Sequence, residues 1–298
     1  MNETINQKKA YIYALVSVLL WSTVATAFKL TLRYTGYIEL LMFSILFSFL
    51  SLLIMVLTGG RRKYLYDLRL KDYFKAALLG FLNPFLYYLL IFKAYTLLPA
   101  QLAQPLNQIW GVVIVLMSVP ILKQKIGIRS VAGVIVSFFG VIVLSTGGRF
   151  LISEIENSAG IIFALLSSVV WSLYWIYNTK SKSTPLVSLF LNFGFGFFYI
   201  AVYYIFFYNS PGISLIALIG TLYIGLFEMG ITFLLWLNAL KYSMTIAKVS
   251  ILIYLAPFFS LLFINYILKE KIRFSSLAGL IFIIGGILIS RTEKKFFN

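Results

Sequence analysis

The chain has 298 residues, of which 61% are hydrophobic and 11% are charged, and its mean hydropathy is +0.95. This composition excludes an ordinary soluble domain and indicates a polytopic membrane protein, because a bilayer is crossed by runs of about 20 mostly apolar residues. The net charge of +16 comes from Lys and Arg residues that are dispersed between the apolar runs. The charge therefore does not form the contiguous basic face that binding of nucleic acid requires.

The predicted elements are ten apolar segments that follow one another along the chain, each expected to form a transmembrane helix. They span residues 11–28, 38–57, 74–97, 101–122, 130–146, 159–177, 186–207, 213–240, 247–268 and 275–290. The connection over residues 59–73 mixes basic residues with leucines and is expected to lie at the membrane surface. The predicted fold class is all-α, with ten transmembrane helices.

The first predicted span recurs in the sixth at an offset of 150 residues. Its residues Ala14, Leu15, Ser17, Trp21 and Ser22 return as Ala164, Leu165, Ser167, Trp171 and Ser172. A signal peptide is the alternative interpretation of the first span, because Lys8 and Lys9 precede its apolar core. The recurrence favours a retained helix that is the counterpart of the sixth.

A second repeat links the fifth and tenth predicted spans. Residues 122–140 return 146 residues later as residues 268–286, with identical residues at nine of nineteen aligned positions. Each copy is a basic hinge followed by an apolar helix whose small residues, seven apart, predict a close-packing face. These small residues are Gly133 and Gly140 in the first copy and Gly279 and Gly286 in the second. A repeat of half the chain length predicts two versions of one five-helix unit, over residues 1–148 and 149–298.

Lys and Arg are divided unequally between the two predicted sides of the membrane. With the N-terminus inside, seventeen fall in the inner connections and six in the outer ones. Because basic residues accumulate on the cytoplasmic side, both termini are predicted to lie in the cytoplasm and the protein in the cytoplasmic membrane. The last outer loop, with Lys269, Lys271 and Arg273, breaks this trend. Inverted repeats require such an exception, since their equivalent hinges face opposite sides.

Three motifs in the second half carry a resemblance to a known family. They are Asn238–Tyr242 (NALKY), Tyr254–Pro257 (YLAP) and Leu268–Lys271 (LKEK). Together with the duplication and a Trp-Ser pair near the start of each half, their order resembles EamA-type members of the drug/metabolite transporter superfamily. The first half departs from that pattern at Gly111 and Gln124, where proline and glutamate would stand. The resemblance implies a ten-helix transporter of small metabolites with a central cavity.

Glu228 is the one acidic residue that falls well inside a predicted span. A carboxylate in hydrocarbon is costly, so it is a functional hypothesis by default. An offset of 145 residues aligns Glu228 with Asn83 in the third span, and Lys93 with Asn238. Polar residues at matching depths are typical of a pseudo-symmetric site near the midplane. Glu228 is interpreted as a counter-charge for a substrate amine or as a proton-coupling carboxylate; a structural ion pair with Lys93, or a hydrogen bond to a neighbouring helix, is the alternative.

The fourth predicted span carries a group of side-chain amides. They belong to Gln101, Gln104, Asn107 and Gln108. The first, second and last of these share a helical face, and Pro105 interrupts the local hydrogen-bond ladder. Such a stripe suits hydrogen bonding to a substrate, and hydrogen bonding between helices is the equally weighted alternative. The stretch with Asn107 and Trp110 also looks like a polar-plus-Trp stretch in amino-acid exporters of the superfamily.

Several aromatic residues are predicted deep inside spans. Trp21, Trp171 and Tyr87 could line a cavity, but burial of aromatic rings against neighbouring helices explains them as well. Packing is the favoured interpretation for each of the three.

The predicted function is a secondary transporter that exports a small organic metabolite, such as an amino acid, by alternating access. The predicted substrate-binding residues are Glu228, Asn83, Gln104, Asn107, Gln108, Trp110, Lys93 and Tyr87. Besides the substrate, the expected partner is the lipid bilayer. The alternatives are a nucleotide-sugar or multidrug carrier, a channel, or a membrane scaffold without transport activity.

Neither a cofactor nor an enzyme activity is expected. Cysteine and histidine are absent from the sequence, which excludes disulfides, thiolate nucleophiles and imidazole metal ligands. No glycine-rich loop ending in Lys-Ser or Lys-Thr is present for ATP. An intramembrane enzyme would also need paired carboxylates or a nucleophile beside a base.

Overall fold

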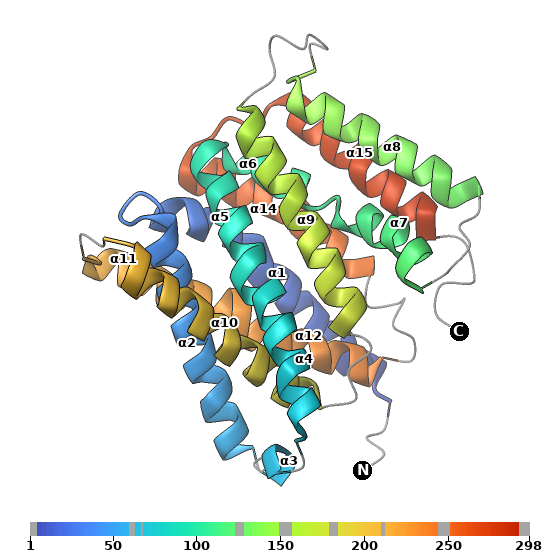
Figure 1. The fold of residues 1–298 in the computed structure, drawn as a ribbon. Helices are drawn as coiled ribbons and strands as arrows, with labels where there is room; N and C mark the ends of the chain where they lie inside the picture. The colour runs from blue at the N-terminus through green and yellow to red at the C-terminus, as the bar shows by residue number, and fades with distance from the viewer. Residues whose placement is uncertain are drawn as a thin grey trace. The chain divides into compact units, whose positions relative to one another are not determined.

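The computed structural model describes residues 5–59, 63–66, 68–122, 128–148, 157–178, 184–209, 212–243 and 251–291. Every regular element within these ranges is a helix, and none is a strand (Figure 1). A helix satisfies its backbone hydrogen bonds internally, which is why long apolar runs adopt it in a bilayer. The predicted all-α class is confirmed.

Six helical segments are long and apolar enough to cross a membrane. They are Gln7–Thr31, Tyr37–Thr58, Leu70–Leu97, Ser158–Asn178, Leu186–Phe207 and Leu215–Trp236. Shorter apolar helical segments span Val131–Leu144, Leu252–Leu268 and Phe274–Ile289. The predicted polytopic membrane class is therefore confirmed as well.

The helices pack into two compact units, and each unit takes segments from both halves of the sequence. The first unit comprises Met1–Phe85 and Ser181–Leu268, and the second comprises Leu86–Lys180 and Lys269–Asn298. A first helix from one half therefore packs with a third helix from the other half in each unit.

The first unit is built around α1 and α2. Its elements are α1 (Gln7–Thr31), α2 (Tyr37–Thr58), α3 (Lys63–Tyr66), α4 (Leu70–Gly80), η1 (Phe81–Leu86), α10 (Pro185–Phe207), α11 (Leu215–Ile224), η3 (Gly225–Gly230), α12 (Ile231–Tyr242), η4 (Ile251–Leu255), α14 (Ala256–Phe263) and η5 (Ile264–Leu268). Helix α1 packs along α12, α14 and α11, while α2 packs against α10, α11 and η3. Asn6 caps α1 by accepting a hydrogen bond from the Lys9 amide.

The second unit contains two helix pairs. Its elements are α5 (Tyr87–Leu97), α6 (Ala100–Asn107), α7 (Trp110–Leu122), α8 (Ile128–Ser145), α9 (Ser158–Asn178) and α15 (Phe274–Arg291). Helix α5 packs along α9, which also contacts α6 and α7. Helices α8 and α15 lie side by side along their length (Figure 1).

The repeated glycines lie in the contact between α8 and α15. A Cβ atom added to Gly140 would stand 2.7 Å from the carbonyl oxygen of Gly279, and one added to Gly286 would collide with Gly133. The Ser137 hydroxyl donates a hydrogen bond of 3.0 Å to the Ile283 carbonyl across the same contact. The two copies of the repeat thus pack on each other, as predicted for these glycines. The hinge residues 123–127 of the first copy lie outside the described residues.

The third and eighth predicted spans each depart from regular α-helix at corresponding places: η1 contains a kink between two helices, and η3 is a π-helical turn. The bounds of η1 and η3 differ by a constant 144 residues, and the two segments contain Asn83 and Glu228. Asn83 itself is extended, with φ −147° and ψ 121°. Pro84 follows it and has no backbone N–H to continue an α-helix. The third and eighth predicted spans are present as Leu70–Leu97 and Leu215–Trp236, and each contains such a segment.

The fourth predicted span, residues 101–122, is also divided. Helix α6 ends at Asn107, and α7 begins at Trp110 after a turn at Gln108 and Ile109. The Gln108 amide is shared between the carbonyls of Gln104 and Pro105, each at 3.1 Å. Helix α6 is therefore a separate element of eight residues.

Candidate functional site

Glu228 lies in η3, and only 9% of its surface is exposed. The segment approaches α2 closely because glycines stand at both of its ends. A Cβ atom added to Gly225 would lie 2.5 Å from the Ser44 carbonyl oxygen, and one added to Gly230 would lie 2.7 Å from the Ser51 hydroxyl. The burial that the sequence predicted for this carboxylate is confirmed, and such burial requires stabilisation by nearby polar groups.

Three serines of α2 form a polar stripe beside η3. Ser44, Ser48 and Ser51 recur at helical spacing and are buried. The hydroxyls of Ser44 and Ser48 make no hydrogen bond within the described part of the chain. Sequence reasoning missed this stripe, although the four- and three-residue spacing of serines in an apolar span was visible. The stripe adds hydroxyl groups beside the segment that carries Glu228.

Trp21 links α1 to the segment that carries Glu228. Its indole Nε1–H donates a hydrogen bond of 3.3 Å to the Glu228 carbonyl oxygen. The same ring packs against Phe233 and Trp236, with centroids 5.9 Å and 5.5 Å away. Aromatic packing of Trp21 is confirmed, and its N–H also makes a specific polar contact.

Asn83 is fully buried in η1. Neither its Oδ1 nor its Nδ2 makes a hydrogen bond within the described residues. Pro84, joined to Asn83 by a cis peptide bond, packs on Gly196 of α10, where an added Cβ would lie 2.5 Å from the proline ring. A buried amide without hydrogen bonds costs about 1–3 kcal/mol, so Asn83 is a structural liability that a functional role would explain.

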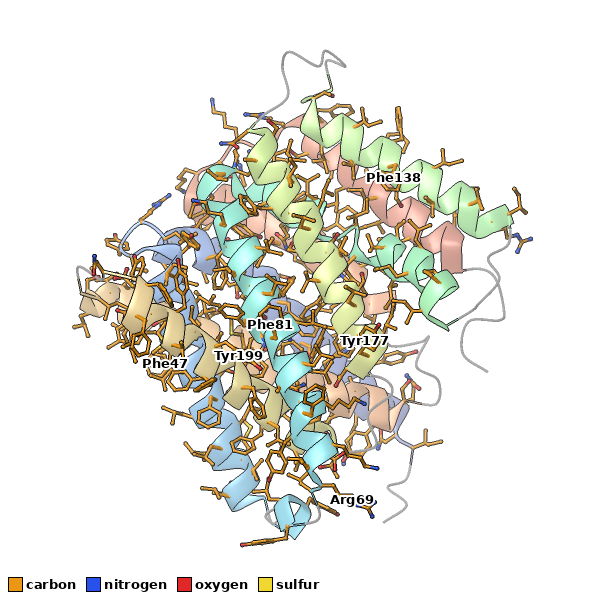
Figure 2. The ribbon with its side chains drawn as sticks, in the orientation of Figure 1. Phe47, Arg69, Phe81, Phe138, Tyr177 and Tyr199 are labelled. Atoms are coloured by element: carbon orange, nitrogen blue, oxygen red, sulfur yellow. The ribbon has the colours of Figure 1, made fainter. Side chains whose placement is uncertain are left out.

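Aromatic contacts flank this break on the α10 side. Phe81 of η1 meets Tyr199 of α10 edge to face at 5.8 Å, and the two labelled rings are seen together in Figure 2. The Tyr199 hydroxyl donates to the Ala77 carbonyl over 3.2 Å. These contacts hold the end of α4 against α10 and so fix the start of η1.

In the second unit, Tyr87 and Asn107 are in direct contact. The Tyr87 hydroxyl donates to Asn107 Oδ1 over 3.2 Å, and Asn107 Nδ2 donates to the Ser167 hydroxyl over 2.8 Å. This chain of hydrogen bonds joins α5, the end of α6 and α9. Tyr87 and Asn107, two of the predicted site residues, are thus brought together.

An aromatic cluster surrounds Tyr87. Its ring lies 4.5 Å from that of Trp171 and 4.7 Å from that of Tyr88. Trp171 also contacts Tyr174 and Trp175, at 6.0 Å and 5.7 Å. The Tyr87 and Trp171 rings therefore pack within an aromatic cluster, and Trp171 is half-buried.

The glutamines of the predicted amide stripe have different surroundings. Gln101 is buried and holds the start of α15: its Oε1 accepts from the Arg273 amide and the Ser276 hydroxyl at 3.0 Å and 3.1 Å, and its Nε2 donates to the Lys271 carbonyl at 3.0 Å. For Gln101 these contacts agree with the alternative interpretation, hydrogen bonding between helices. Gln104 and Gln108 remain half-buried on the same segment.

The remaining predicted residues lie in the second unit. Trp110 begins α7, where its carbonyl accepts a hydrogen bond of 3.0 Å from the Ser172 hydroxyl. Its side chain is half-buried, as is that of Lys93 on α5. Glu228 and Asn83 belong to the first unit, so the predicted residues fall into two groups, each organised within its own unit.

Comparison with known proteins gives the chain a clear set of relatives. The EamA-like transporter family matches residues 8–146 and again residues 158–292. An uncharacterized transporter of Clostridium kluyveri is 26% identical over 299 residues, covering 98% of this chain and 96% of the relative. The uncharacterized transporter YvbV of Bacillus subtilis is 26% identical over 283 residues, covering 93% and 90%. A crystal structure with 20% identity has the same fold, with a TM-score of 0.65 over 96% of this chain and 97% of that chain.

Proposed function

The chain belongs to the EamA-like transporter family, and from this premise we propose that it is a secondary transporter of a small organic metabolite in the cytoplasmic membrane. The proposed cargo is an amino acid or a related amine-bearing compound, and the proposed direction is export. Transport proceeds by alternating access without ATP, at a site near the midplane of the membrane.

The proposed architecture is ten transmembrane helices in two inverted five-helix repeats, with both termini in the cytoplasm. Six long apolar segments account for six of the spans. The four others correspond to α6 with α7, to α8, to the η4–α14–η5 segment and to α15. The two family matches, residues 8–146 and 158–292, support a duplicated unit.

The observation that carries the proposal is the paired interruption of the third and eighth spans. Secondary transporters form their sites from broken helices at equivalent positions of two repeats, because a break frees backbone groups for a substrate or ion. Here η1 and η3 stand at equivalent positions and contain Asn83 and Glu228. A scaffold without transport activity has no need of such polar breaks.

Each predicted site residue is given a role in this proposal. Glu228 balances the charge of a substrate amine or carries a coupled proton. Asn83, Gln104, Asn107 and Gln108 provide hydrogen bonds, and Tyr87 orients Asn107. Trp110 packs on the substrate, and Lys93 is the candidate contact for a substrate carboxylate.

A multidrug carrier for flat organic cations is the second candidate, favoured by the aromatic cluster of Tyr87, Trp171 and Trp175. The faces of aromatic rings attract such cations without specific hydrogen bonds. An amino-acid carrier would depend on the side-chain amides, whereas a multidrug carrier would tolerate their loss.

Counterflow in proteoliposomes tests the proposal. Amino acids, nucleotide-sugars and cationic dyes are offered to the wild type, to Glu228→Gln and to the control Glu39→Gln. Glu39 is a buried carboxylate that accepts hydrogen bonds from Gly36 and Thr35 at the start of α2. The expected result is saturable amino-acid exchange that Glu228→Gln abolishes or makes insensitive to pH, while Glu39→Gln retains it.

The other outcomes of this assay are equally informative. Exchange that Glu228→Gln leaves unchanged would remove Glu228 from the transport site. Exchange of dyes alone would replace amino-acid transport by multidrug transport. If folded protein exchanged no compound of the panel, the proposal of metabolite transport would lose its support.

A further inference from the structure

Helix α6 is a short, separate element whose two ends make different kinds of contact. It has eight residues, which at about 1.5 Å per residue gives a length of about 12 Å. Pro99 precedes its first residue, and the turn at Gln108 and Ile109 separates it from α7. Backbone hydrogen bonds through this turn join the C-terminal end of α6 to α7, whereas its N-terminal end depends on contacts with other segments.

The N-terminal end of α6 is held by the hinge that precedes α15. The Glu270 carboxylate accepts hydrogen bonds from the Ala100 and Gln101 amides, at 3.3 Å and 3.4 Å. A carboxylate at this place satisfies free amides of the first turn and complements the helix dipole.

Gln101, in the first turn of α6, in turn bonds to the segment that carries Glu270. Its side chain bonds to the Lys271 carbonyl, the Arg273 amide and the Ser276 hydroxyl at the start of α15. Each helix start is thus capped by a residue of the other segment. Because Gln101 and Ser276 are buried, water competes poorly for these bonds.

The C-terminal end of α6 carries Asn107, the amide that contacts Tyr87 and Ser167. Residues 100 and 107 are seven residues apart on one short helix, about 10 Å along its axis, and Pro105 removes one backbone hydrogen bond between them. A shift of the capped end is therefore transmitted to Asn107. The contacts with Tyr87 and Ser167, at 3.2 Å and 2.8 Å, tolerate little movement.

We propose that Glu270 is a positioning residue of the transport site, which holds α6 through its first-turn amides and thereby places Asn107 against Tyr87. This inference rests on the proposed function, since it assigns Asn107 to the substrate. The basic hinge before α15 would then do more than set the topology. Its Glu270 would align the Asn107 amide at the C-terminal end of α6. Gln101 acts with Glu270 by fixing the same end to α15.

Hydrogen–deuterium exchange of the full-length protein in lipid nanodiscs tests the proposal without any substrate. Glu270→Gln keeps the shape of the side chain but removes the charge that caps α6. Glu39→Gln is the control, because Glu39 is a buried carboxylate of the first unit that accepts the Gly36 amide at the start of its own helix, α2. We expect Glu270→Gln to speed exchange by about tenfold over residues 100–113, and Glu39→Gln to speed exchange only at the start of α2.

The range of faster exchange decides between positioning and a local cap. Acceleration confined to residues 100–103, with residues 107–113 unchanged, would overturn the proposal. This measurement needs no transported compound. Its outcome is therefore independent of the counterflow assay, which tests the proposed transport function.

A double-mutant comparison in counterflow supplies the functional readout. Glu270→Gln should raise the KM of the exchanged substrate by about tenfold and change the maximal rate little. Tyr87→Phe should raise KM in the wild type but have little further effect in Glu270→Gln, because both changes disturb the same contact. Effects that multiply fully would show that Glu270 acts independently of Tyr87 and Asn107, and would overturn the proposal.

Discussion

The indole N–H of Trp21 donates a hydrogen bond of 3.3 Å to the backbone carbonyl of Glu228, a residue 207 positions further along the chain. The contact joins the first helix of one half to the π-helical turn in the third helix of the other. Its repeat counterpart, Trp171, packs on Tyr87 of α5 and so makes the equivalent crossing in the second unit. In each unit, the tryptophan of the first helix of one half thus contacts the third helix of the other half.

Trp21→Phe is predicted to weaken transport more than it weakens the fold. The phenylalanine keeps an aromatic ring beside Phe233 and Trp236 but loses the donor to the Glu228 carbonyl. A hydrogen bond contributes about 1 kcal/mol, so we expect about a fivefold rise in KM in counterflow. Trp236→Phe is the control, because Trp236 packs on the same ring without that bond. Equal effects of the two substitutions would mean that ring size, and not the bond, matters.

Gly286→Ala is predicted to destabilise the second unit. The added methyl group would meet the Gly133 carbonyl and the Ser137 hydroxyl, so α8 and α15 would have to separate. Overpacking of this kind costs about 1–3 kcal/mol, and thermal unfolding in detergent should show a lower midpoint. Gly285→Ala is a neighbouring control, since nothing lies within 4 Å of a Cβ at that position. A stable Gly286→Ala protein would contradict this tight helix contact.

The internal repeat and the charge inside an apolar run could be recognised from the sequence alone, because both leave direct marks. Identical residues at a constant offset survive in residues 122–140 and 268–286, and Glu228 stands out as a charge inside an apolar run. Its alignment with Asn83 followed from the same offset. These predictions needed no knowledge of tertiary contacts.

Other features depended on contacts between distant residues and could not be predicted. The role of Gln101 is set by partners at positions 271, 273 and 276, at least 170 residues away. The breaks in the third and eighth spans depend on Pro84 and on glycines that admit α2, signals that are common in membrane helices without a break. The exchange of helices between the halves likewise has no local signature.

Tyr87→Phe is predicted to impair substrate binding while leaving stability nearly unchanged. The substitution removes the hydroxyl that orients Asn107, and the ring contact with Trp171 remains. We expect about a fivefold rise in KM and a change in unfolding free energy of about 1 kcal/mol or less. Tyr66→Phe is the control, because that side chain is 86% exposed. Unchanged KM in Tyr87→Phe would place the Tyr87–Asn107 pair outside the site.

Asn83→Leu is predicted to stabilise the protein and to abolish its transport. The amide is fully buried without a hydrogen bond in the described structure, so an apolar side chain with the same branching removes a penalty of about 1–3 kcal/mol. Thermal unfolding in detergent should occur at a higher temperature, and counterflow should be lost because the substrate loses a polar partner.

Gln101→Leu provides the contrast for this prediction. Gln101 is almost as buried as Asn83, but it makes three hydrogen bonds to the start of α15, so its replacement should destabilise the protein. Destabilisation in both variants would show that Asn83 has a structural role. A buried amide that weakens the fold is expected to be kept only for function. Higher stability with normal counterflow in Asn83→Leu would therefore show that the amide serves neither the stability of the fold nor transport.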